Sequence, residues 1–202
     1  MELLAAWRDG DQRAGKLLFQ RHYAKISRFF YNKASEDDAA DLIQRCFLRC
    51  IEHQSRKRPE TSFGAYLFGI ARNVLYEYYR RKRRGRELVD FQTCTLADLG
   101  PTPSSQLGHQ REAQLLLQAL RQIPVEMQVT LELYMFEGLS GKEIAAITNA
   151  PLGTVRTRIH RGKQQLQKRV EALTHNPALR ESTMSGLEHW ARMIRQRSSQ
   201  PS

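Results

Sequence analysis

The sequence has few of the features that mark secreted or membrane-embedded proteins. Its 202 residues include only three cysteines, Cys46, Cys50 and Cys94, and this small odd number argues against a disulfide framework. The sequence has neither a signal-peptide pattern nor an apolar run long enough to cross a bilayer. We therefore expect a cytoplasmic protein with reduced thiols and no membrane insertion.

Signatures of catalysis and of bound cofactors are also missing. Cys46, Cys50 and His53 share a helical spacing, but no second pair of ligands completes a tetrahedral zinc site. Both cysteines lie among apolar residues, where cysteine usually acts as a small buried hydrophobe. The sequence shows no nucleotide-binding loop, no paired catalytic carboxylates and no Ser/His/Asp arrangement. It therefore predicts no catalytic residues, no metal site, no cofactor and no enzymatic activity.

Positive charge, by contrast, is abundant. The chain has 32 lysines and arginines against 21 acidic residues, a net charge of +11, which favours a polyanionic partner, nucleic acid first. Helical periodicity recurs over residues 3–51, 63–79 and 112–170, and strand signals are almost absent. The sequence therefore predicts an all-α fold.

The helical pattern lapses between Gly85 and Gln110. This stretch includes "DLGPTPSSQLGHQ", whose proline, glycine and serine content favours an irregular connector. We expect two small helical domains joined by a flexible linker, followed by a short tail with an amphipathic helix. The predicted bounds are 1–88 and 111–174 for the domains, 89–110 for the linker and 175–202 for the C-terminal extension.

A helix-turn-helix pattern lies in the second domain. Ser140 and Glu143 have the spacing of a capping box and predict a short helix after them. Asn149 tolerates a left-handed turn conformation, and Pro151 suits the first turn of a second helix. In a helix-turn-helix the second helix enters the major groove of DNA.

The second helix of this pair divides into two faces. Val155, Ile159, Leu166 and Val170 fall at helical spacing and predict a packed face. The rest of its surface could hold phosphates or read base edges, since arginine pairs with guanine and threonine offers a hydroxyl and a methyl group. An ordinary helical hairpin with a solvated basic face is the alternative. The candidate residues are Thr154, Arg156, Thr157, Arg158, His160, Arg161 and Lys163.

The first domain has a helix that mixes aromatic and basic residues. In "FGAYLFGIARNVLYEYYRRKRR", Tyr76 and Tyr79 lie near Asn73 and the basic run Arg80–Arg84. Rings beside cations suit an unstacked nucleic-acid strand, because bases stack on rings while cations neutralise phosphates. For any one tyrosine, however, the sequence favours the alternative, a core helix that ends in a solvated basic tail.

Together these segments resemble the bacterial sigma factors of the extracytoplasmic-function group. "DAADLIQRCFLRC" is similar to their core-polymerase-binding segment, D-A-E-D-L-x-Q-E-x-F, and "FGAYLFGIARN" to their promoter-melting helix, F-x-x-W-L-x-x-I-A-x-N. "LSGKEIA" and "GTVRTR" look like L-S-x-x-E-I-A and G-T-V-[KR]-[ST]-R of sigma domain 4. The segments follow the family's order.

The resemblance implies core RNA polymerase and promoter DNA as partners, and it leaves an anti-sigma factor open. It implies a −35 contact by the second helix of the helix-turn-helix. The implied polymerase-binding residues are Asp38, Asp41, Leu42, Gln44, Arg45 and Phe47. The implied −10 residues are Asn73, Tyr76, Tyr79, Arg80, Arg81, Arg83 and Arg84.

Two departures make the implied polymerase-binding helix less acidic than the family's. Ala40 and Arg45 stand where the family usually has glutamates. Two other functions remain as alternatives at this point. One is a helix-turn-helix transcriptional regulator that acts without a sigma role, and the other is an RNA-binding protein that uses the tyrosine- and arginine-rich helix for single strands.

Overall fold

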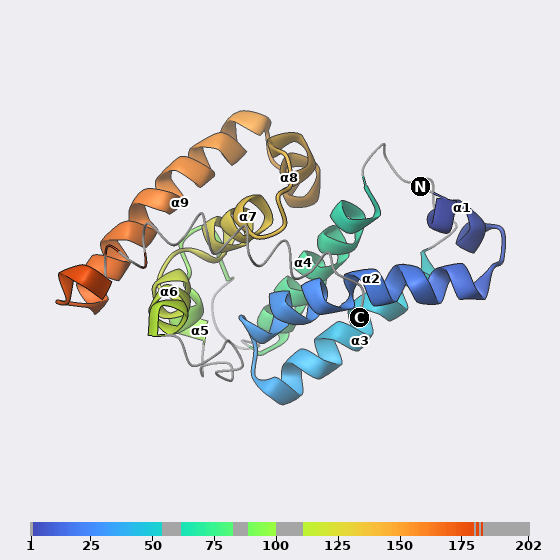
Figure 1. Ribbon diagram of the computed structural model, residues 1–202, viewed down its shortest axis with the longest axis horizontal. Helices are drawn as coiled ribbons and strands as arrows, with labels where there is room; N and C mark the ends of the chain where they lie inside the picture. The colour runs from blue at the N-terminus through green and yellow to red at the C-terminus, as the bar shows by residue number, and fades with distance from the viewer. Residues whose placement is uncertain are drawn as a thin grey trace.

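The computed structural model describes residues 2–53, 62–82, 89–99 and 111–179, together with residues 181 and 183. This part of the chain is built from helices without a β-strand, which confirms the predicted all-α fold (Figure 1). The helices are α1 Glu2–Arg8, α2 Gln12–Tyr31, α3 Glu36–Glu52, α4 Phe63–Lys82, α5 Leu96–Leu99, α6 Arg111–Arg121, α7 Val125–Met135, α8 Gly141–Thr148 and α9 Leu152–Leu173.

Polar residues at the start of α2 and α3 determine where these helices begin. The Asp11 carboxylate accepts hydrogen bonds from the backbone N–H groups of Arg13 and Ala14, at 2.8 and 3.2 Å. Ser35 caps α3, whose first turn carries Glu36, Asp37 and Asp38. Negative charge there interacts favourably with the amino-terminal end of the helix dipole. These caps satisfy backbone amides that have no partner within the helix.

The helices form two groups that pack against each other. Figure 1 shows α1–α4 in one group and α6–α9 in the other, with α8 against α4. One apolar core begins among α2, α3 and α4 and continues through Val125, Val129, Leu133 and Ile144 of the second group. A second core lies among α6, α7 and α9. The two units predicted from the sequence therefore share a buried interface.

The first part of the predicted linker is folded. Phe91 is buried and stacks on Tyr76, with ring centroids 4.0 Å apart, and Leu96 is fully buried. The carbonyl groups of Cys94 and Phe91 accept hydrogen bonds from the N–H groups of Val125 and Glu126, both at 3.0 Å. Since Pro124 provides no side-chain cap for α7, residues 91–94 satisfy these amides in its place.

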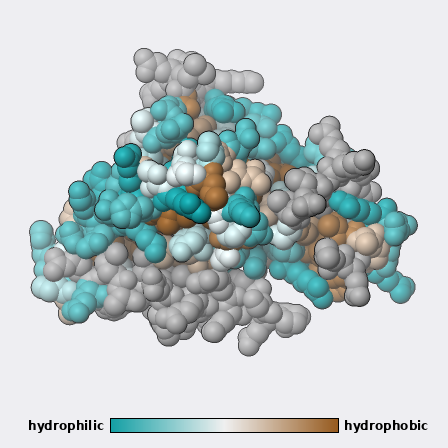
Figure 2. Space-filling model, turned by 90° about the horizontal axis from the view of Figure 1, so that it is seen from above, coloured by the Kyte–Doolittle hydropathy of each residue, from teal (hydrophilic) through white to brown (hydrophobic). Residues whose placement is uncertain are grey.

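The surface has the division expected of amphipathic helices. The face in Figure 2 is largely hydrophilic, with scattered hydrophobic patches. No helix in the described ranges is both long and apolar enough to cross a membrane. The amphipathic helix predicted in the tail, with Leu187, Trp190 and Ile194, lies outside the described residues.

We expect Phe91→Ala to lower the free energy of unfolding by about 3–5 kcal/mol, the usual cost of removing a buried phenyl ring. The neighbouring Gln92 is exposed, so Gln92→Ala should change it by less than about 0.5 kcal/mol. Urea unfolding followed by circular dichroism measures both variants. Equal stability of the two would contradict a packed role for residues 89–99.

Candidate nucleic-acid interface

The helix-turn-helix predicted in the second unit is present as α8, a tight turn and α9. Ser140 Oγ accepts a hydrogen bond from the N–H of Glu143 at 3.3 Å, and the Glu143 carboxylate accepts one from the N–H of Ser140 at 2.9 Å. These bonds form the predicted capping box. The backbone N–H of Ser140, more than any other group, holds the pKa of Glu143 below its usual value.

The turn depends on one backbone conformation. Asn149 has φ 49° and ψ 47°, in the left-handed region that the sequence predicted for it. Pro151 follows as the residue that caps α9, one position before the helix begins. The two helices are therefore held in the order and with the tight connection of a DNA-reading pair.

The packed face of α9 is the one predicted. Val155, Leu166 and Val170 are buried, and Ile159 is half-buried. Gly162 lies against α7, where a Cβ atom would come within 3.1 Å of the Leu131 side chain. Because this position has no side chain, α9 can approach α7 closely.

Most of the predicted −35 residues lie on the open face of α9. Lys163 is half-buried, with its ammonium group 5.5 Å from the ring centroid of Tyr134. Arg158 differs from the rest, because its side chain is only 13% exposed and pairs with Glu126 at 3.4 Å. The exposed residues are Thr154, Arg156, Thr157, His160 and Arg161.

A hollow of about 660 Å³ lies beside Asn73 in the first unit. Asn73 is exposed, and the wall around it includes Arg72, Arg80, Tyr66 and Gln92. Its lining comes from α3, α4, residues 89–92 and α7. The hollow therefore offers hydrogen-bonding and cationic groups next to the residue that the sequence singled out, together with the carboxylates of Glu77, Asp90 and Glu126.

The two candidate tyrosines do not present their rings to solvent. Tyr76 and Tyr79 are each 5% exposed. Tyr76 stacks on Phe91, and the Tyr79 hydroxyl donates a hydrogen bond to the backbone carbonyl of Lys33. Burial raises the pKa of both phenols. In this conformation the two rings therefore belong to the core, as the alternative of a core helix with a basic tail expects.

The structure describes the basic run at the end of α4 as far as Lys82. Arg80 and Arg81 are exposed, and the Arg80 guanidinium lies 5.8 Å from the ring centroid of Phe91. Arg83 and Arg84 lie outside the described residues. The described arginines are placed where they could neutralise phosphates.

The predicted polymerase-binding residues of α3 have different environments. Asp41, Gln44 and Arg45 are exposed, and Arg45 Nε lies 2.8 Å from the Asp41 carboxylate. Leu42 is 1% exposed and belongs to the core. Phe47 is half-buried, and its ring stacks with that of Tyr23 at 6.1 Å between centroids.

Asp38 is part of a local network. Its carboxylate accepts hydrogen bonds from the hydroxyls of Ser35 at 2.5 Å and Tyr78 at 2.8 Å, and from Lys82 at 3.4 Å. The Ser35 bond is the main reason that the pKa of Asp38 is lowered. Asp38 therefore joins the start of α3 to the end of α4.

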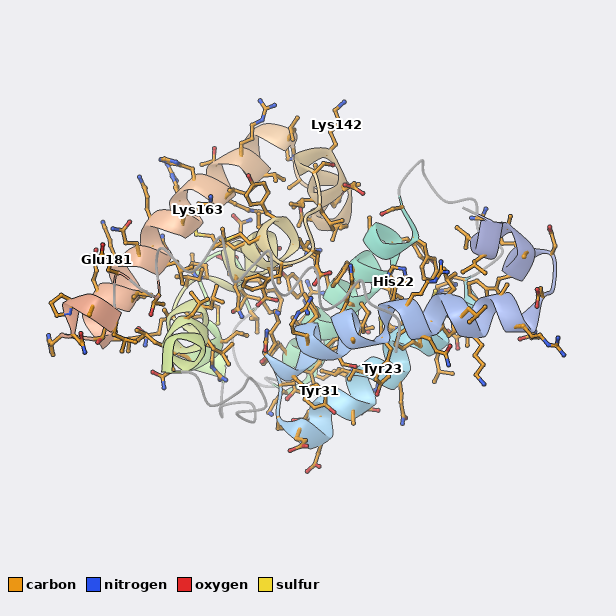
Figure 3. The ribbon with its side chains drawn as sticks, in the orientation of Figure 1. His22, Tyr23, Tyr31, Lys142, Lys163 and Glu181 are labelled. Atoms are coloured by element: carbon orange, nitrogen blue, oxygen red, sulfur yellow. The ribbon has the colours of Figure 1, made fainter. Side chains whose placement is uncertain are left out.

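The structure adds residues that the sequence analysis did not select. Leu48 and Ile51 are 56% and 45% exposed on α3, beside an apolar hollow of about 490 Å³ that Phe19, Tyr23 and Phe47 line. Figure 3 shows Tyr23 on the α3 side of α2 and His22 on the α4 side. The sequence did carry a signal for them, because Leu48 and Ile51 are apolar residues at the edge of the apolar stripe of an amphipathic helix.

A basic hollow of about 560 Å³ lies beside the helix-turn-helix. Lys142, Arg156, His160 and Lys163 line it together with Tyr134, which is 41% exposed. In Figure 3 the Lys142 side chain extends outward from α8. Lys142 and Tyr134 were missed because neither belongs to the periodic pattern of α9.

The cysteines are placed as structural residues. Cys46 and Cys50 are buried in α3, and the Cys46 thiol lies 3.8 Å from the backbone carbonyl of Leu67. Burial raises the pKa of Cys46. Within the described ranges, no group of three or more His, Cys, Asp or Glu side chains is arranged to hold a metal ion.

The sequence matches two family models, in order along the chain. Residues 18–85 match Sigma-70 region 2, and residues 113–166 match Sigma-70, region 4. Together these stretches span more than half of the chain. The first covers most of α2 with α3 and α4, and the second runs from α6 into α9.

Curated relatives match across both units. The ECF RNA polymerase sigma-E factors of Haemophilus influenzae and of Escherichia coli strain K12 are each 26% identical to this chain over 172 residues. The match covers 81% of this chain and 91% and 90% of the two relatives.

Two solved structures have a similar fold. CnrH in complex with the cytosolic domain of CnrY gives a TM-score of 0.65 at 22% identity, over 85% of this chain and 97% of that one. The sigma factor RpoE in complex with the anti-sigma factor NepR from Bartonella quintana gives 0.58 at 22% identity, over 78% and 95%.

We expect the left-handed turn between α8 and α9 to reject β-branched residues. Asn149→Val should lower the free energy of unfolding by about 1–2 kcal/mol, because its Cβ crowds the backbone at positive φ. Asn149→Gly should leave it nearly unchanged or raise it slightly, since glycine adopts this conformation freely. Thermal or urea unfolding of the pair checks the difference, and similar losses in both would show that the conformation does not limit the turn.

Proposed function

The chain belongs to the extracytoplasmic-function (ECF) group of sigma-70 factors, and we propose that its two helical units divide the task of such a factor. A sigma factor binds core RNA polymerase and directs transcription initiation at promoters with −35 and −10 elements. The α2–α4 unit serves the polymerase and the −10 element, and the α6–α9 unit serves the −35 element. The protein acts in the cytoplasm and performs no catalysis of its own.

The observation that carries this function is the ordered pair of region 2 and region 4 matches on two helical units. A helix-turn-helix regulator without a sigma role would use only the second unit and leave the region 2 match unexplained. The capped α8, the left-handed Asn149 and the exposed arginines of α9 support the assignment of −35 reading to the second unit.

For core polymerase we propose the open face of α3. Asp41 and Gln44 are exposed there, and Leu48 and Ile51 extend the same surface with apolar area. Arg45 holds the Asp41 carboxylate, so part of the negative charge of this face is neutralised before any partner arrives. Leu42 and Phe47 contribute by packing α3 in place, and Asp38 by joining it to α4.

For the −10 element we propose the surface around Asn73. An unpaired base of the non-template strand would enter the hollow beside Asn73, whose polar wall offsets the few kcal/mol lost on unstacking. Arg80 and Arg81 neutralise the neighbouring phosphates. Tyr76 and Tyr79 shape α4 from within the core in the conformation described here.

We also propose an anti-sigma partner. One of the solved relatives by fold is a sigma factor in complex with the anti-sigma factor NepR, and another is CnrH in complex with the cytosolic domain of CnrY. This chain has a similar fold over most of its length. A proteinaceous inhibitor that binds between or across the two units would suit it.

Run-off transcription with purified core polymerase tests the function, and arginine variants test the −35 face. Wild-type protein should direct transcription from its promoter, and core polymerase alone should not. Arg156→Ala and Arg161→Ala should each cost about 1–3 kcal/mol of promoter binding if they read a base. Arg169→Ala is the matched control, because Arg169 is an exposed arginine about two turns farther along α9. Equal losses in all three variants would refute a specific face at Arg156 and Arg161.

Charge variants of α3 test the polymerase contact. Arg45→Glu should raise the affinity for core polymerase by about 1.4-fold to fivefold, since an exposed ion pair that restrains Asp41 is worth roughly 0.2–1 kcal/mol. Asp41→Lys should lower it, because a like charge would face a basic surface. Arg169→Glu, which makes the same charge change in the other unit, should have little effect. Binding of each variant to immobilised core polymerase measures these affinities. A loss of affinity in Arg45→Glu would show that the polymerase surface opposite α3 is not basic.

A further inference from the structure

Three carboxylates of the second unit are buried against cations, most of them from the first unit. Three side chains, those of Glu126, Glu132 and Glu137 on α7 and just beyond its end, are each no more than 8% exposed. Lys25 and Arg28 of α2 pair with Glu137, Lys33 pairs with Glu132, and Arg72 of α4 pairs with Glu126. A buried charge is strongly unfavourable without its partner, so these pairs hold the two units in one relative position.

The most deeply buried of these pairs is formed by Lys33. Its side chain is fully buried, with the ammonium group 3.0 Å from the carbonyl of Phe29 and 3.9 Å from the centroid of the Phe29 ring. Burial lowers the pKa of Lys33, and the Glu132 carboxylate opposes this effect. Lys33 is therefore accommodated here by a group from the other unit.

A fourth carboxylate, that of Glu143, joins the start of α4 to the start of α8. Ser62 caps α4 through the N–H of Ala65 at 3.2 Å and also donates a hydrogen bond to Glu143 at 3.2 Å. Glu143 is the acidic member of the α8 capping box. One carboxylate therefore contacts the starts of both helices.

Glu126 brings the two candidate DNA surfaces together. Arg72, the neighbour of Asn73, binds one oxygen of this carboxylate, and Arg158 of α9 lies 3.4 Å from the other. The −35 and −10 elements are named for their positions before the transcription start, so they lie about 25 base pairs apart. This separation is about 85 Å at 3.4 Å per base pair. Arg72 and Arg158 cannot share one carboxylate while their helices occupy both elements.

We propose that the contacts of Glu126, Glu132, Glu137 and Glu143 form an autoinhibitory latch that holds the free protein closed and unable to occupy both promoter elements. This inference rests on the proposed function and adds regulation to it. Asp41 and Gln44 remain exposed in the closed form, so core polymerase can bind α3 first. Opening of the latch then frees Arg158 of α9 and Arg72, the neighbour of Asn73, from Glu126.

The ion pair of Arg28 with Glu137 provides the test, because it lies outside both DNA surfaces. Glu137→Lys and Arg28→Glu each place like charges in contact and should open the protein. The double variant R28E/E137K restores opposite charges, keeps the net charge of the wild type and should close it again. Arg21→Glu is the control for the second single variant, since Arg21 is exposed on the same helix.

Small-angle scattering and binding to a −35 duplex without polymerase provide the two readouts. Both single variants should have a larger radius of gyration and bind the duplex at least about fivefold more tightly, the lower end of typical coupling between sites. Charge alone predicts opposite changes for the two, because Glu137→Lys adds positive charge and Arg28→Glu removes it. The double variant and Arg21→Glu should both keep the wild-type radius of gyration, and the double variant the wild-type affinity.

Wild-type dimensions in both single variants, with affinities that follow net charge, would overturn the latch. If circular dichroism shows that either single variant is unfolded, Glu137→Gln replaces it, which removes the charge and keeps the shape. Run-off transcription by the wild type decides the sigma function separately. A wild type that transcribes while the variants stay closed rejects the latch alone, and failure of transcription with variants that open rejects the function alone.

Discussion

The arrangement of the molecule depends on the pairing of the α7 carboxylates with cations of the first unit. Apolar residues of both units form one continuous core, but that core is bordered by Glu126, Glu132 and Glu137. None of these carboxylates could be buried without a cation opposite it. Lys33, Arg28 and Arg72 provide that charge, and the position of α7 and α8 against α4 follows from it.

This closure also decides which functional residues are open. The acidic face of α3 and most of the basic face of α9 remain exposed, whereas Arg158 is held at the interface. Residues 89–99 fit the same arrangement, since Phe91 packs on α4 while its carbonyl group caps the start of α7. A segment that touches both units in this way limits how far they can separate without losing its own contacts.

Local features of the fold could be predicted from the sequence, and long-range ones could not. The capping box of Ser140 and Glu143 and the left-handed Asn149 are determined within a few residues, so pattern analysis found them. Arg158 looks like Arg156 and Arg161 in the sequence, and only Glu126, 32 residues away along the chain, sets it apart. For Tyr76 the sequence favoured a core role without excluding a nucleic-acid contact, and the stacking partner Phe91 explains why its ring is buried. The partner in each case comes from another element, which helical periodicity does not report.

The charged border of the interface suits a contact that must open. A purely apolar interface loses about 25 cal/mol for each Å² it exposes to water, and nothing is gained in return. Charged groups regain hydration on separation, which offsets much of the attraction that is lost. The Lys33–Glu132 pair therefore makes the closed arrangement specific. A shift of one unit against the other would leave each of these charges buried without its partner. Separation of the two units, however, returns both to water, so the closed form can be well defined and still yield to a partner that binds the open one.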